Sequence, residues 1–572
     1  MPQLRLALAQ LNASVGDLAG NADAVLAWCR RAADAGADVV LLPEMMLTGY
    51  PVEDLALRQS FAIASRRALD ALTARLAEAG LGELLVVVGY LDLDDAGPRN
   101  AAALIHRGAV VDRYDKHHLP NYGVFDEFRY FCPGSALPIV RVRGADLGVV
   151  ICEDIWQDGG PVAAYGALGV DLLLCLNGSP YERAKDDTRG ALVARRAREA
   201  GAPMAYVNLV GGQDELVFDG DSMVADASGV IVARAPQFVE HLLVVELDLP
   251  GGRGTHARPA GFEVRRSTLD ATPPADRPPL DPPPRFAPLG DEDEVWWALR
   301  TGLGDYARKN GFRSVVLGLS GGIDSAVVAA LSVDALGADA VHGVSMPSKY
   351  SSAHSRSDAA DLARRTGLHY TVQPIDEMVE VFVAQLALTG LAEENVQARC
   401  RGVTLMALSN ADGHLVLATG NKTELAVGYS TIYGDAVGGF APIKDVPKTL
   451  VWRLARWRNE QARRRGETPP IPPSSIEKPP SAELAPGQLD SDSLPDYALL
   501  DDVLDSYVES DRGFDDLVAA GFSPETIEDV VRLVDRAEYK RRQYPPGTKI
   551  TTKGFGRDRR LPITNTWREH RP

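Results

Sequence analysis

The sequence contains no apolar run long enough to span a membrane. A transmembrane helix needs about 20 predominantly apolar residues in a row, and charged or turn-forming residues interrupt every apolar run here well before that length. The first residues, MPQLRLALAQLN, also lack the basic flank and the long apolar block of a signal peptide. We therefore expect a soluble protein with no membrane partner.

Cysteine is scarce and is not arranged in pairs. The five cysteines are odd in number, scattered and never spaced as CxxC: Cys29, Cys132, Cys152, Cys175 and Cys400. Such a set predicts neither a disulfide framework nor a structural zinc site. It favours a reducing compartment, so we expect the protein to be cytoplasmic.

Basic residues are fewer than acidic residues. Lysine and arginine number 60 against 78 aspartates and glutamates, which gives a formal net charge of −18. Nucleic acids and anionic membranes bind basic surfaces. The composition therefore argues against a nucleic-acid partner and is typical of an enzyme whose partners are small-molecule substrates.

A chain of 572 residues is too long for one hydrophobic core and is expected to divide into domains. Proline marks the division, because residues 270–290 (DATPPADRPPLDPPPRFAPLG) hold eight prolines and almost no apolar periodicity. That composition favours an extended, semi-rigid polyproline segment over a packed element. We predict a first domain at 1–270, a linker at 271–290 and a second domain at 291–572.

The most informative motif lies at residues 314–336, SVVLGLSGGIDSAVVAALSVDAL. A β-branched run predicts a buried strand at 314–319, and the Ala/Val/Leu pattern after residue 325 predicts a helix. The glycine-rich turn between them can direct backbone N–H groups at a phosphate bound at the helix N-terminus. The GK[ST] ending of a Walker A loop is missing.

In residues 1–270, short apolar runs alternate with segments of helical periodicity. Strands are predicted at 4–8, 38–42, 84–91, 147–151, 171–176, 205–210 and 241–248, and helices at 21–35 and 182–200. Many strands with a few long helices suggest two sheets with helices on their outer faces. Glu44, Lys116 and Cys152 each follow one of the apolar runs.

These three residue types form a minimal set for hydrolysing an amide through a thioester. A catalytic thiol must lose its proton, which requires a nearby base or a cation that lowers its pKa. A carboxylate can accept that proton and later activate water, while a lysine can stabilise the oxyanion. Each of the three, taken alone, is also explained as an ordinary buried cysteine or a solvated charge.

The blocks LLPEMMLTGY, YDKHHLPNYGVFDE, VVICEDIW and LNGSPYERAK resemble the catalytic blocks of the nitrilase superfamily, in its glutamine amidotransferase branch. The resemblance covers nearly all of residues 3–250. It implies an α-β-β-α sandwich in which Glu44 is the general base, Lys116 stabilises the oxyanion and Cys152 is the nucleophile.

The same resemblance implies that Tyr122, Ser179 and Lys185 bind glutamine and that Glu127 is a supporting carboxylate. Gly178 stands where the block is expected to have alanine, a change between small residues that we expect to matter little. Cys29 and Cys175 lie within apolar segments and are expected to be core residues.

In the second domain, strand and helix patterns alternate after the glycine-rich turn. VHGVSMP and HYTVQPID are typical of strands, and DAADLARRTGL and EENVQARCRGVTLMALSN are typical of helices. This alternation predicts a doubly wound parallel sheet with its ligand at the carboxyl ends of its strands. The fold class is therefore α/β in both domains.

SGGIDS resembles the signature of the ATP pyrophosphatases, which cleave ATP between its α and β phosphates and adenylate a substrate. The stretches MPSKYSSAHS, LVLATGNKTELAVGYSTIYGDAVGGFAPIKDVPKT and KRRQYPPGTKI resemble the NAD synthetase family, from about residue 290 to the C-terminus. Joined to the nitrilase-like half, this half resembles the family of glutamine-dependent NAD synthetases.

This resemblance implies contacts for each ligand of the second domain. The implied ATP-binding residues are Gly318, Leu319, Ser320, Gly321, Gly322, Ile323, Asp324, Ser325, Thr419, Lys448 and Ser481. Those implied for deamido-NAD (nicotinic acid adenine dinucleotide) are Asn395, Glu424 and Lys540. Arg399 and Arg401 are further candidates, equally well explained as solvated helix residues. Asp324 and Glu424 would hold Mg²⁺, which prefers oxygen ligands beside phosphates.

The implied reaction is ATP-dependent amidation of deamido-NAD to NAD, with ammonia released from glutamine and channelled between the sites. Two alternatives stay open. The same ATP loop could serve amidation of another carboxylate, as in GMP or asparagine synthetases, although those families use other glutaminase folds. The first domain could also be a non-catalytic docking module on an ammonia-dependent synthetase.

The resemblance further implies a homo-oligomer, paired through the synthetase domain. Residues 466–496, rich in proline and serine, are expected to form a loop over the active site.

Overall fold

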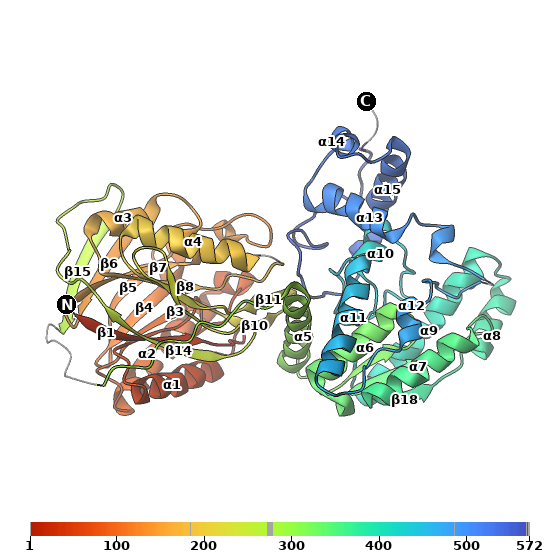
Figure 1. The fold of residues 1–572 in the computed structure, drawn as a ribbon, viewed down its shortest axis with the longest axis horizontal. Coiled ribbons are helices and arrows are strands. Elements are labelled where there is room, and N and C mark those ends of the chain that lie inside the picture. The colour runs from red at the N-terminus through yellow and green to blue at the C-terminus, as the bar shows by residue number, and fades with distance from the viewer. Residues whose placement is uncertain (1, 184, 271–277, 486, 568, 570–572) are drawn as a thin grey trace. The chain divides into compact units, whose positions relative to one another are not determined.

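The computed structural model describes residues 2–183, 185–270, 278–485, 487–567 and 569 (Figure 1). The chain divides into two compact units. The first comprises Met1–Gln213 and Val217–Leu289, and the second comprises Asp214–Leu216 and Gly290–Pro572. Each unit has its own sheet system and its own buried core.

The first sheet of the first unit has six strands in the order β14-β1-β2-β3-β4-β5. Their bounds are β14 (His241–Asp248), β1 (Gln3–Gln10), β2 (Val39–Leu41), β3 (Leu85–Asp94), β4 (Gly97–His106) and β5 (Ala109–Asp115). β1, β2 and β3 run parallel, and the pairs at either side of them are antiparallel. Helices α1 (Leu18–Asp34) and α2 (Gln59–Glu78) cover its outer face.

The second sheet has seven strands in the order β13-β12-β9-β8-β7-β6-β15. Their bounds are β13 (Ile231–Arg234), β12 (Met223–Ala225), β9 (Met204–Asn208), β8 (Leu172–Asn177), β7 (Ala145–Ile151), β6 (Ala136–Val142) and β15 (Glu263–Asp270). Helices α3 (Gly160–Leu168) and α4 (Lys185–Ala200) lie on its outer face, opposite α1 and α2 in Figure 1. A short ribbon, β10 (Val210–Gln213) and β11 (Leu216–Asp219), forms a separate two-stranded sheet.

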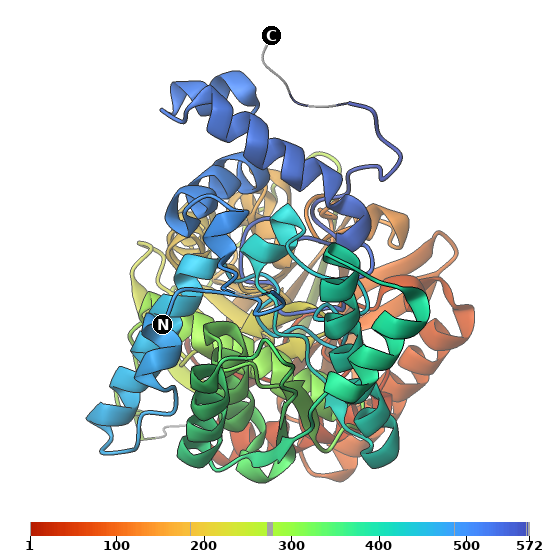
Figure 2. The same cartoon turned by 90° about the vertical axis from the view of Figure 1, so that its right-hand side faces the viewer.

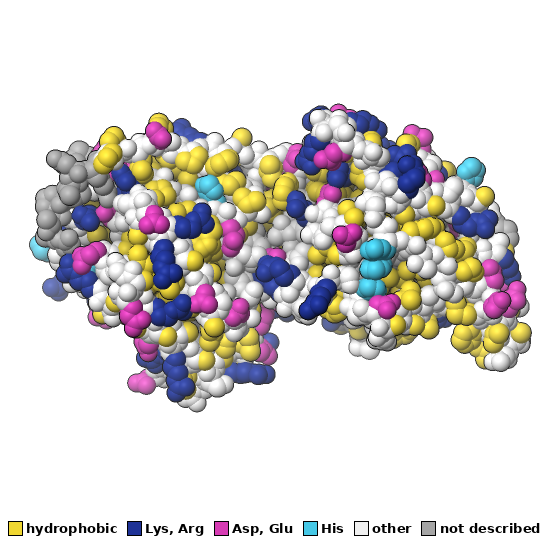
Figure 3. All heavy atoms as spheres, turned by 90° about the horizontal axis from the view of Figure 1, so that it is seen from below, with side chains coloured by type: hydrophobic (Ala, Val, Ile, Leu, Met, Phe, Trp, Pro, Cys, Tyr) yellow, Lys and Arg dark blue, Asp and Glu magenta, His cyan; other side chains and the backbone are white. Residues whose placement is uncertain are grey.

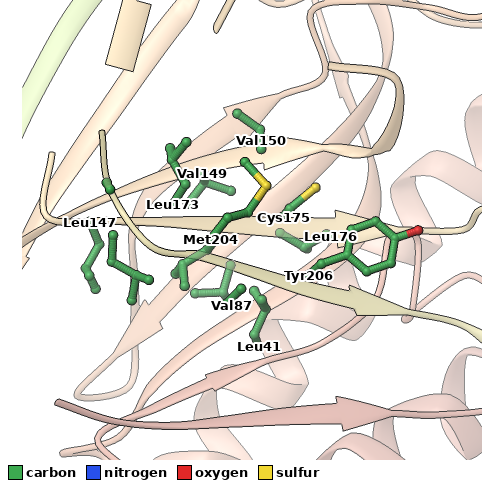
Figure 4. Packing of buried hydrophobic residues seen from close by; sticks show 14 of the residues in the cluster. Leu41, Val87, Leu147, Val149, Val150, Leu173, Cys175, Leu176, Met204 and Tyr206 are labelled. Atoms are coloured by element: carbon green, nitrogen blue, oxygen red, sulfur yellow. The ribbon is translucent and has the colours of Figure 1, made fainter. Parts of the chain in front are cut away.

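Apolar side chains from both sheets meet in one buried cluster between them. Figure 4 shows Leu41 and Val87 of the first sheet close to Leu173 and Met204 of the second. Truncating such a fully buried leucine typically costs about 2–5 kcal/mol of unfolding free energy. This layering confirms the α-β-β-α sandwich.

Only part of the predicted linker is described, because residues 271–277 lie outside the described residues. The part that follows packs on the first unit. A guanidinium nitrogen of Arg5 donates to the carbonyl oxygen of Pro278 at 2.8 Å, and the Arg234 N–H donates to that of Pro284 at 3.0 Å.

The second unit is built on a four-stranded parallel sheet in the order β18-β17-β16-β19. The strands are β16 (Val315–Gly318), β17 (Val341–Ser345), β18 (His369–Val372) and β19 (Leu415–Val416). The chain leaves β16 in one direction towards β18 and returns to β19 on the other side of β16. Because such crossovers are right-handed, α6 (Ile323–Leu336) and α7 (Ala353–Thr366) cover one face and α9 (Leu391–Asp412) covers the other.

This doubly wound topology confirms the second predicted fold. A crevice for ligands is expected at the carboxyl end of β16, where the direction of winding reverses. Helix α5 (Asp291–Lys309) packs against α6, and α8 (Asp376–Leu386) packs against α9.

Helices after residue 420 complete the second unit. They are α10 (Lys422–Val427), α11 (Lys448–Arg464), α12 (Pro473–Glu477), α13 (Tyr497–Leu504), α14 (Phe514–Ala519), α15 (Pro524–Arg536) and α16 (Glu538–Arg541). Figure 2 shows the helices after residue 490, in blue, gathered at one end of the unit. α13 and α15 share a buried cluster with α10 rather than with the sheet, and α14 packs with α15 in a second cluster.

Within the described part of the chain, no helix is both long and apolar enough to cross a membrane. On the face drawn in Figure 3, acidic and basic side chains are interspersed and no continuous basic surface is present.

Candidate functional site

Three strand ends in the first unit carry the predicted triad. Glu44 lies three residues after β2, Lys116 directly follows β5, and Cys152 begins the short 3₁₀ helix Cys152–Ile155 directly after β7. All three side chains are at least 95% buried. The structure therefore brings together residues that are 36 to 108 positions apart in the sequence.

Lys116 is held between two carboxylates. Its Nζ lies 2.8 Å from Glu44 Oε1 and 2.9 Å from Glu127 Oε2. The Tyr50 hydroxyl donates to Glu127 Oε1 at 2.9 Å. Removing one partner of a fully buried ion pair leaves an uncompensated charge and costs about 3–5 kcal/mol, so this arrangement fixes the ammonium group firmly.

Burial and neighbouring charges set the protonation of this cluster. Burial alone would lower the pKa of Lys116, but Glu127 and Glu44 outweigh it and hold that pKa well above its usual range. Burial raises the pKa of Glu127 to about 7, with Lys116 opposing the rise. Lys116 is therefore a permanent cation, and Glu127 titrates near neutrality.

The Cys152 thiol is not pre-ionised. Burial raises its pKa, the Glu44 carboxylate raises it further, and Lys116 only partly opposes them. Lys116 lowers this pKa, as expected of a nearby cation, but burial and the Glu44 carboxylate outweigh it. Since the resting group is a thiol, it needs a base to remove its proton at the moment of attack, and Glu44 is the carboxylate whose charge acts most strongly on it.

Two further groups orient Glu44. The Asn100 side-chain amide donates to Oε1 at 2.7 Å, and the Gly178 backbone N–H donates to Oε2 at 2.7 Å. A Cβ at residue 178 would lie 2.8 Å from a ring carbon of Tyr50. In this chain the glycine therefore leaves the space that the Tyr50 ring occupies, and the departure from alanine has a structural role.

Cys152 has a left-handed backbone conformation, with φ at 44°. This region is strained for a residue with a side chain. A nucleophile on such a sharp turn between strand and helix projects its side chain away from the sheet.

The predicted glutamine-binding residues lie around the same strand ends. The Tyr122 hydroxyl donates to Glu153 Oε2 at 2.9 Å, and the Ser179 N–H donates to Asn208 Oδ1 at 2.9 Å. Lys185 Nζ lies 3.0 Å from the carbonyl oxygen of Pro180. Glu153 itself was not singled out from the sequence, although it directly follows the nucleophile in CEDIW and is 4% exposed.

In the second unit, the SGGIDS segment forms the turn from β16 into α6. Gly321 has a φ of +79°, and a Cβ there would run into the carbonyl oxygen of Ser355. Ser320 Oγ accepts from the Gly322 N–H at 3.2 Å and lies 3.1 Å from Ser325 Oγ. These contacts hold the turn at the helix N-terminus, where N–H groups and the helix dipole favour an anion.

Lys448, at the start of α11, joins two carboxylates beside this turn. Its Nζ lies 2.5 Å from Asp324 Oδ2 and 3.0 Å from Glu424 Oε1. The Asn421 side chain, also missed from the sequence, donates to Asp324 Oδ1 at 2.9 Å. Burial raises the pKa of Glu424 to about 7, with Lys448 lowering and Asp324 raising it.

This donor set fits a magnesium ion. Among the described residues, no three acidic, histidine or cysteine side chains converge as a metal cage. Mg²⁺ is usually held by one or two carboxylates together with substrate phosphates and water, and Asp324 and Glu424 supply that number beside the anion-binding turn.

The segment 466–496, in which residue 486 is not described, contacts the SGGIDS turn at one point and the start of α7 at another. Ser475 Oγ donates to the carbonyl oxygen of Gly321 at 3.0 Å, and Ser355 Oγ donates to Glu483 Oε1 at 2.7 Å. Ser481 donates to the carbonyl oxygen of Gln488 and accepts from the Glu483 N–H, so it shapes this loop.

Three of the remaining predicted residues, Asn395, Arg399 and Lys540, contact the segment 428–432. Lys540 Nζ donates to the carbonyl oxygens of Gly428 and Ser430 at 2.6 and 2.7 Å, and Asn395 Oδ1 accepts from Thr431 at 2.8 Å. Arg399 donates to the Ile432 carbonyl oxygen at 3.3 Å. Arg401 instead donates at 3.1 Å to the carbonyl oxygen of Met346, just past β17, and Thr419 lies between β19 and α10.

The two halves of the chain match two protein families. Residues 5–257 match the carbon-nitrogen hydrolase family, and residues 295–544 match the NAD synthase family.

Relatives match the chain over its whole length. A glutamine-dependent NAD(+) synthetase of Xanthomonas campestris pv. campestris is 44% identical over 571 residues, covering 98% of this chain and 97% of that protein. The structure of a glutamine-dependent NAD+ synthetase from Acinetobacter baumannii, in complex with ADP, is 39% identical, covers 100% of both chains and has a TM-score of 0.73. That of a glutamine-dependent NAD(+) synthetase from Cytophaga hutchinsonii, 21% identical, covers 99% and 98% of the two chains with a TM-score of 0.80 and shares the fold.

Proposed function

Because the chain belongs to the family of glutamine-dependent NAD+ synthetases, we propose that Glu44, Lys116 and Cys152 form its glutaminase site. The enzyme is a carbon–nitrogen ligase that converts deamido-NAD+ to NAD+ with ATP and glutamine. The observation that supports the site is the buried ammonium of Lys116, fixed between Glu44 and Glu127 next to the Cys152 thiol.

The first half-reaction would proceed as nucleophilic attack. Glu44 takes the proton of Cys152 as the sulfur attacks the carboxamide carbon of glutamine. Lys116 stabilises the negative charge that develops on the carboxamide oxygen. The proton held by Glu44 then passes to the departing nitrogen, which leaves as ammonia, and a glutamyl thioester remains on Cys152.

Water completes the cycle. Glu44, again ionised, removes a proton from water as it attacks the thioester, and glutamate leaves while the thiol is restored. Glu153 would recognise the α-ammonium group of glutamine, because its buried carboxylate lies beside the nucleophile and is already held by the Tyr122 hydroxyl. Ser179 and Lys185 would bind the remaining polar groups of the substrate.

The synthetase half would adenylate the nicotinate carboxylate of deamido-NAD+. Its oxygen attacks the α-phosphorus of ATP, pyrophosphate leaves, and ammonia then displaces AMP from the acyl adenylate to form the amide. The turn Gly318–Ser325 would bind the phosphates through its N–H groups, together with Lys448, Thr419 and Ser481. Asn395, Glu424 and Lys540 would contact deamido-NAD+, with Arg399 and Arg401 nearby.

Asp324 and Glu424 would hold Mg²⁺. The bound ion would neutralise phosphate charge, whereas Lys448 keeps the two carboxylates apart and oriented when they lack a cation.

A docking role for the first unit does not fit its site. A non-catalytic module gains nothing from a buried lysine between two carboxylates, an arrangement that is costly to desolvate. Whole-chain relatives that are named glutamine-dependent also support the glutaminase over this alternative.

A cysteine exchange tests the proposal. Cys152→Ala is expected to lower glutamate release from glutamine by at least 10³-fold, since no thioester can form. Cys175→Ala is the matched control, because Cys175 is equally buried but packs in the core of β8 (Figure 4). The measurement is the release of isotopically labelled glutamate from labelled glutamine. Equal rates in wild type and Cys152→Ala would disprove the assignment.

We also propose that the enzyme pairs through the synthetase unit. Exposed apolar side chains gather on α8 and the neighbouring α9: Val381, Phe382, Leu386, Leu391 and Val403 are 48–70% exposed. A second copy would cover them. A Phe382→Glu change should then lower the mass measured by light scattering.

We place the reaction in the reducing cytoplasm, since all five cysteines are free and Cys152 must stay a thiol.

A further inference from the structure

A cavity of about 330 Å³ in the second unit is used by none of the steps above. It opens between α5, α6 and α11, and most of its lining consists of indole and guanidinium groups: Trp296, Trp297, Arg300, Trp457, Arg458 and Arg465. Its size lies at the lower end of the range for small-molecule sites.

The aromatic walls are fixed in place. Trp296 and Trp457 lie with ring centroids 5.7 Å apart, and the Trp296 indole N–H donates to Asp334 Oδ2 at 2.9 Å. Trp297 is partly exposed, and the Arg300 guanidinium lies 4.5 Å from the centroid of its ring. Rigid indole faces of this kind stack planar heteroaromatic rings.

The lining of the cavity carries more positive than negative charge, with the guanidinium groups of Arg300, Arg458 and Arg465 against the carboxylates of Asp334 and Glu467. Arg458 is paired with Asp334 through two hydrogen bonds of 2.6 and 2.9 Å. Glu467 also lines the cavity, but across the described residues no carboxylate forms an ion pair with Arg300 or Arg465. In a protein with a net charge of −18, this excess of positive charge beside the partly exposed indoles of Trp297 and Trp457 points to an anionic ligand.

The cavity is connected to the synthetase site by two helices. Near the start of α6 and α11, Asp324 pairs with Lys448; ten residues further along both helices, Asp334 pairs with Arg458 in the wall of the cavity. The equal spacing shows that the helices run side by side in the same direction. Ten helical residues span about 15 Å. The two ion pairs therefore join α6 to α11 at two points about that far apart.

We propose that this cavity is a second nucleotide site, which binds a mononucleotide by stacking its base on Trp457 and Trp297 and pairing its phosphate with Arg300 and Arg465. A bound anion at this end changes how α6 packs on α11. The same helix pair positions Asp324 and Lys448, so occupancy and synthetase rate are coupled.

Binding stoichiometry tests the proposal in the full-length chain. AMP, nicotinamide mononucleotide and inorganic phosphate are each dialysed against wild type, the double variant Arg300→Ala/Trp457→Ala, and Trp28→Ala. Trp28 is the matched control, because Arg31 also stacks on its ring, at 3.8 Å, and Trp28 does not line this cavity. We expect one more mononucleotide site per chain in wild type and Trp28→Ala than in the double variant, with at least tenfold weaker binding after loss of the indole.

The relative affinities of the two mononucleotides show whether a purine or a pyridine base is the natural ligand. The AMP bound at the synthetase site reports that the double variant is folded. Equal stoichiometry in wild type and double variant overturns the proposal, and so does phosphate binding as tight as that of the mononucleotides. These measurements do not depend on the roles proposed for Asp324 and Lys448.

A kinetic measurement, which does rest on those roles, tests the coupling. At saturating ATP and deamido-NAD+, the better-binding mononucleotide should change the rate of ammonia-driven NAD+ formation at least twofold in wild type. The double variant should not respond. A response of the same size in both proteins overturns the coupling.

Discussion

At the scale of single residues, the proposed glutaminase site depends on charges that are buried together. Lys116 is paired with Glu44 and Glu127, and its positive charge is what permits two carboxylates to lie in a site that excludes water. The Cys152 thiol adds no charge at rest, because burial raises its pKa. The site is therefore poised to transfer a proton only when a substrate carbonyl arrives.

Glu127→Gln should remove a pH dependence of stability. Burial raises the pKa of Glu127 from 4.5 to about 7. Between these values the folded protein keeps a proton on Glu127 that the unfolded chain releases. The contribution of Glu127 to the free energy of unfolding is therefore largest below pH 4.5 and is lost as the pH rises through 7. The loss in unfolding free energy is about 3 kcal/mol, because the pKa rises by about 2.5 and each unit corresponds to about 1.36 kcal/mol.

Calorimetric melting between pH 5 and 8 checks this prediction. The melting temperature of wild type should fall with rising pH more steeply than that of Glu127→Gln, whatever their absolute values. Parallel curves would show that Glu127 does not titrate in this range.

At the scale of elements, the turn from β16 to α6 depends on one glycine. Gly321 has a positive φ, and a Cβ there would run into the Ser355 carbonyl oxygen, whereas Gly322 has a φ of −78° and its Cβ would meet only Ser320 Oγ at 3.3 Å. Gly321→Ala should lower the unfolding free energy of the second unit by about 2 kcal/mol or more. Gly322→Ala should cost less than about 1 kcal/mol.

Denaturant unfolding of both variants, followed by the fluorescence of tryptophans in α5 and α11, provides the measurement. Similar losses in the two would mean that the strained conformation of residue 321 is not what the turn requires.

Strand ends are the part of this fold that the sequence predicts best. Glu44, Lys116 and Cys152 were singled out because each follows a short apolar run, and the structure places all three after strands: two after buried strands, and Lys116 after the antiparallel edge strand β5. The SGGIDS turn was found for the same reason. Both folds could be predicted because the alternation of strands and helices is a local sequence pattern, and the structure confirms both.

Contacts made across the fold were missed. Asn100 orients Glu44 from the middle of a strand, and Asn421 holds Asp324 from another element, yet neither has a local signal. β15 pairs with β6 across more than a hundred residues, which no periodicity in either segment indicates. The raised pKa of Cys152 was also unpredictable, since it depends on how completely the site is buried.

At the scale of the whole molecule, the chain joins a site that makes ammonia to a site that consumes it. Free ammonia at neutral pH is mostly protonated and cannot attack an acyl adenylate. A glutaminase that ran without a waiting acceptor would only waste glutamine. We therefore expect glutamate release to be slow in the enzyme alone and to rise several-fold when ATP and deamido-NAD+ are both present.

Glutamate release with and without the two synthetase substrates measures this effect. ATP alone or deamido-NAD+ alone should give less activation than both, because only both together form the acyl adenylate. The same rate under all four conditions would show two active sites that are merely tethered.

The division of labour between the halves is the central claim, and NAD+ formation from two nitrogen sources tests it most directly. Wild type, Cys152→Ala and Asp324→Asn are each supplied with ATP, Mg²⁺, deamido-NAD+ and either glutamine or ammonium chloride. Cys152→Ala should make NAD+ only from ammonium chloride, at close to the wild-type rate. Asp324→Asn, which keeps the size of the side chain but loses its charge, should lose NAD+ formation from both sources by about 10²-fold or more while still releasing glutamate. If Cys152→Ala made NAD+ from glutamine, or if it lost both activities while remaining folded, the account would be contradicted.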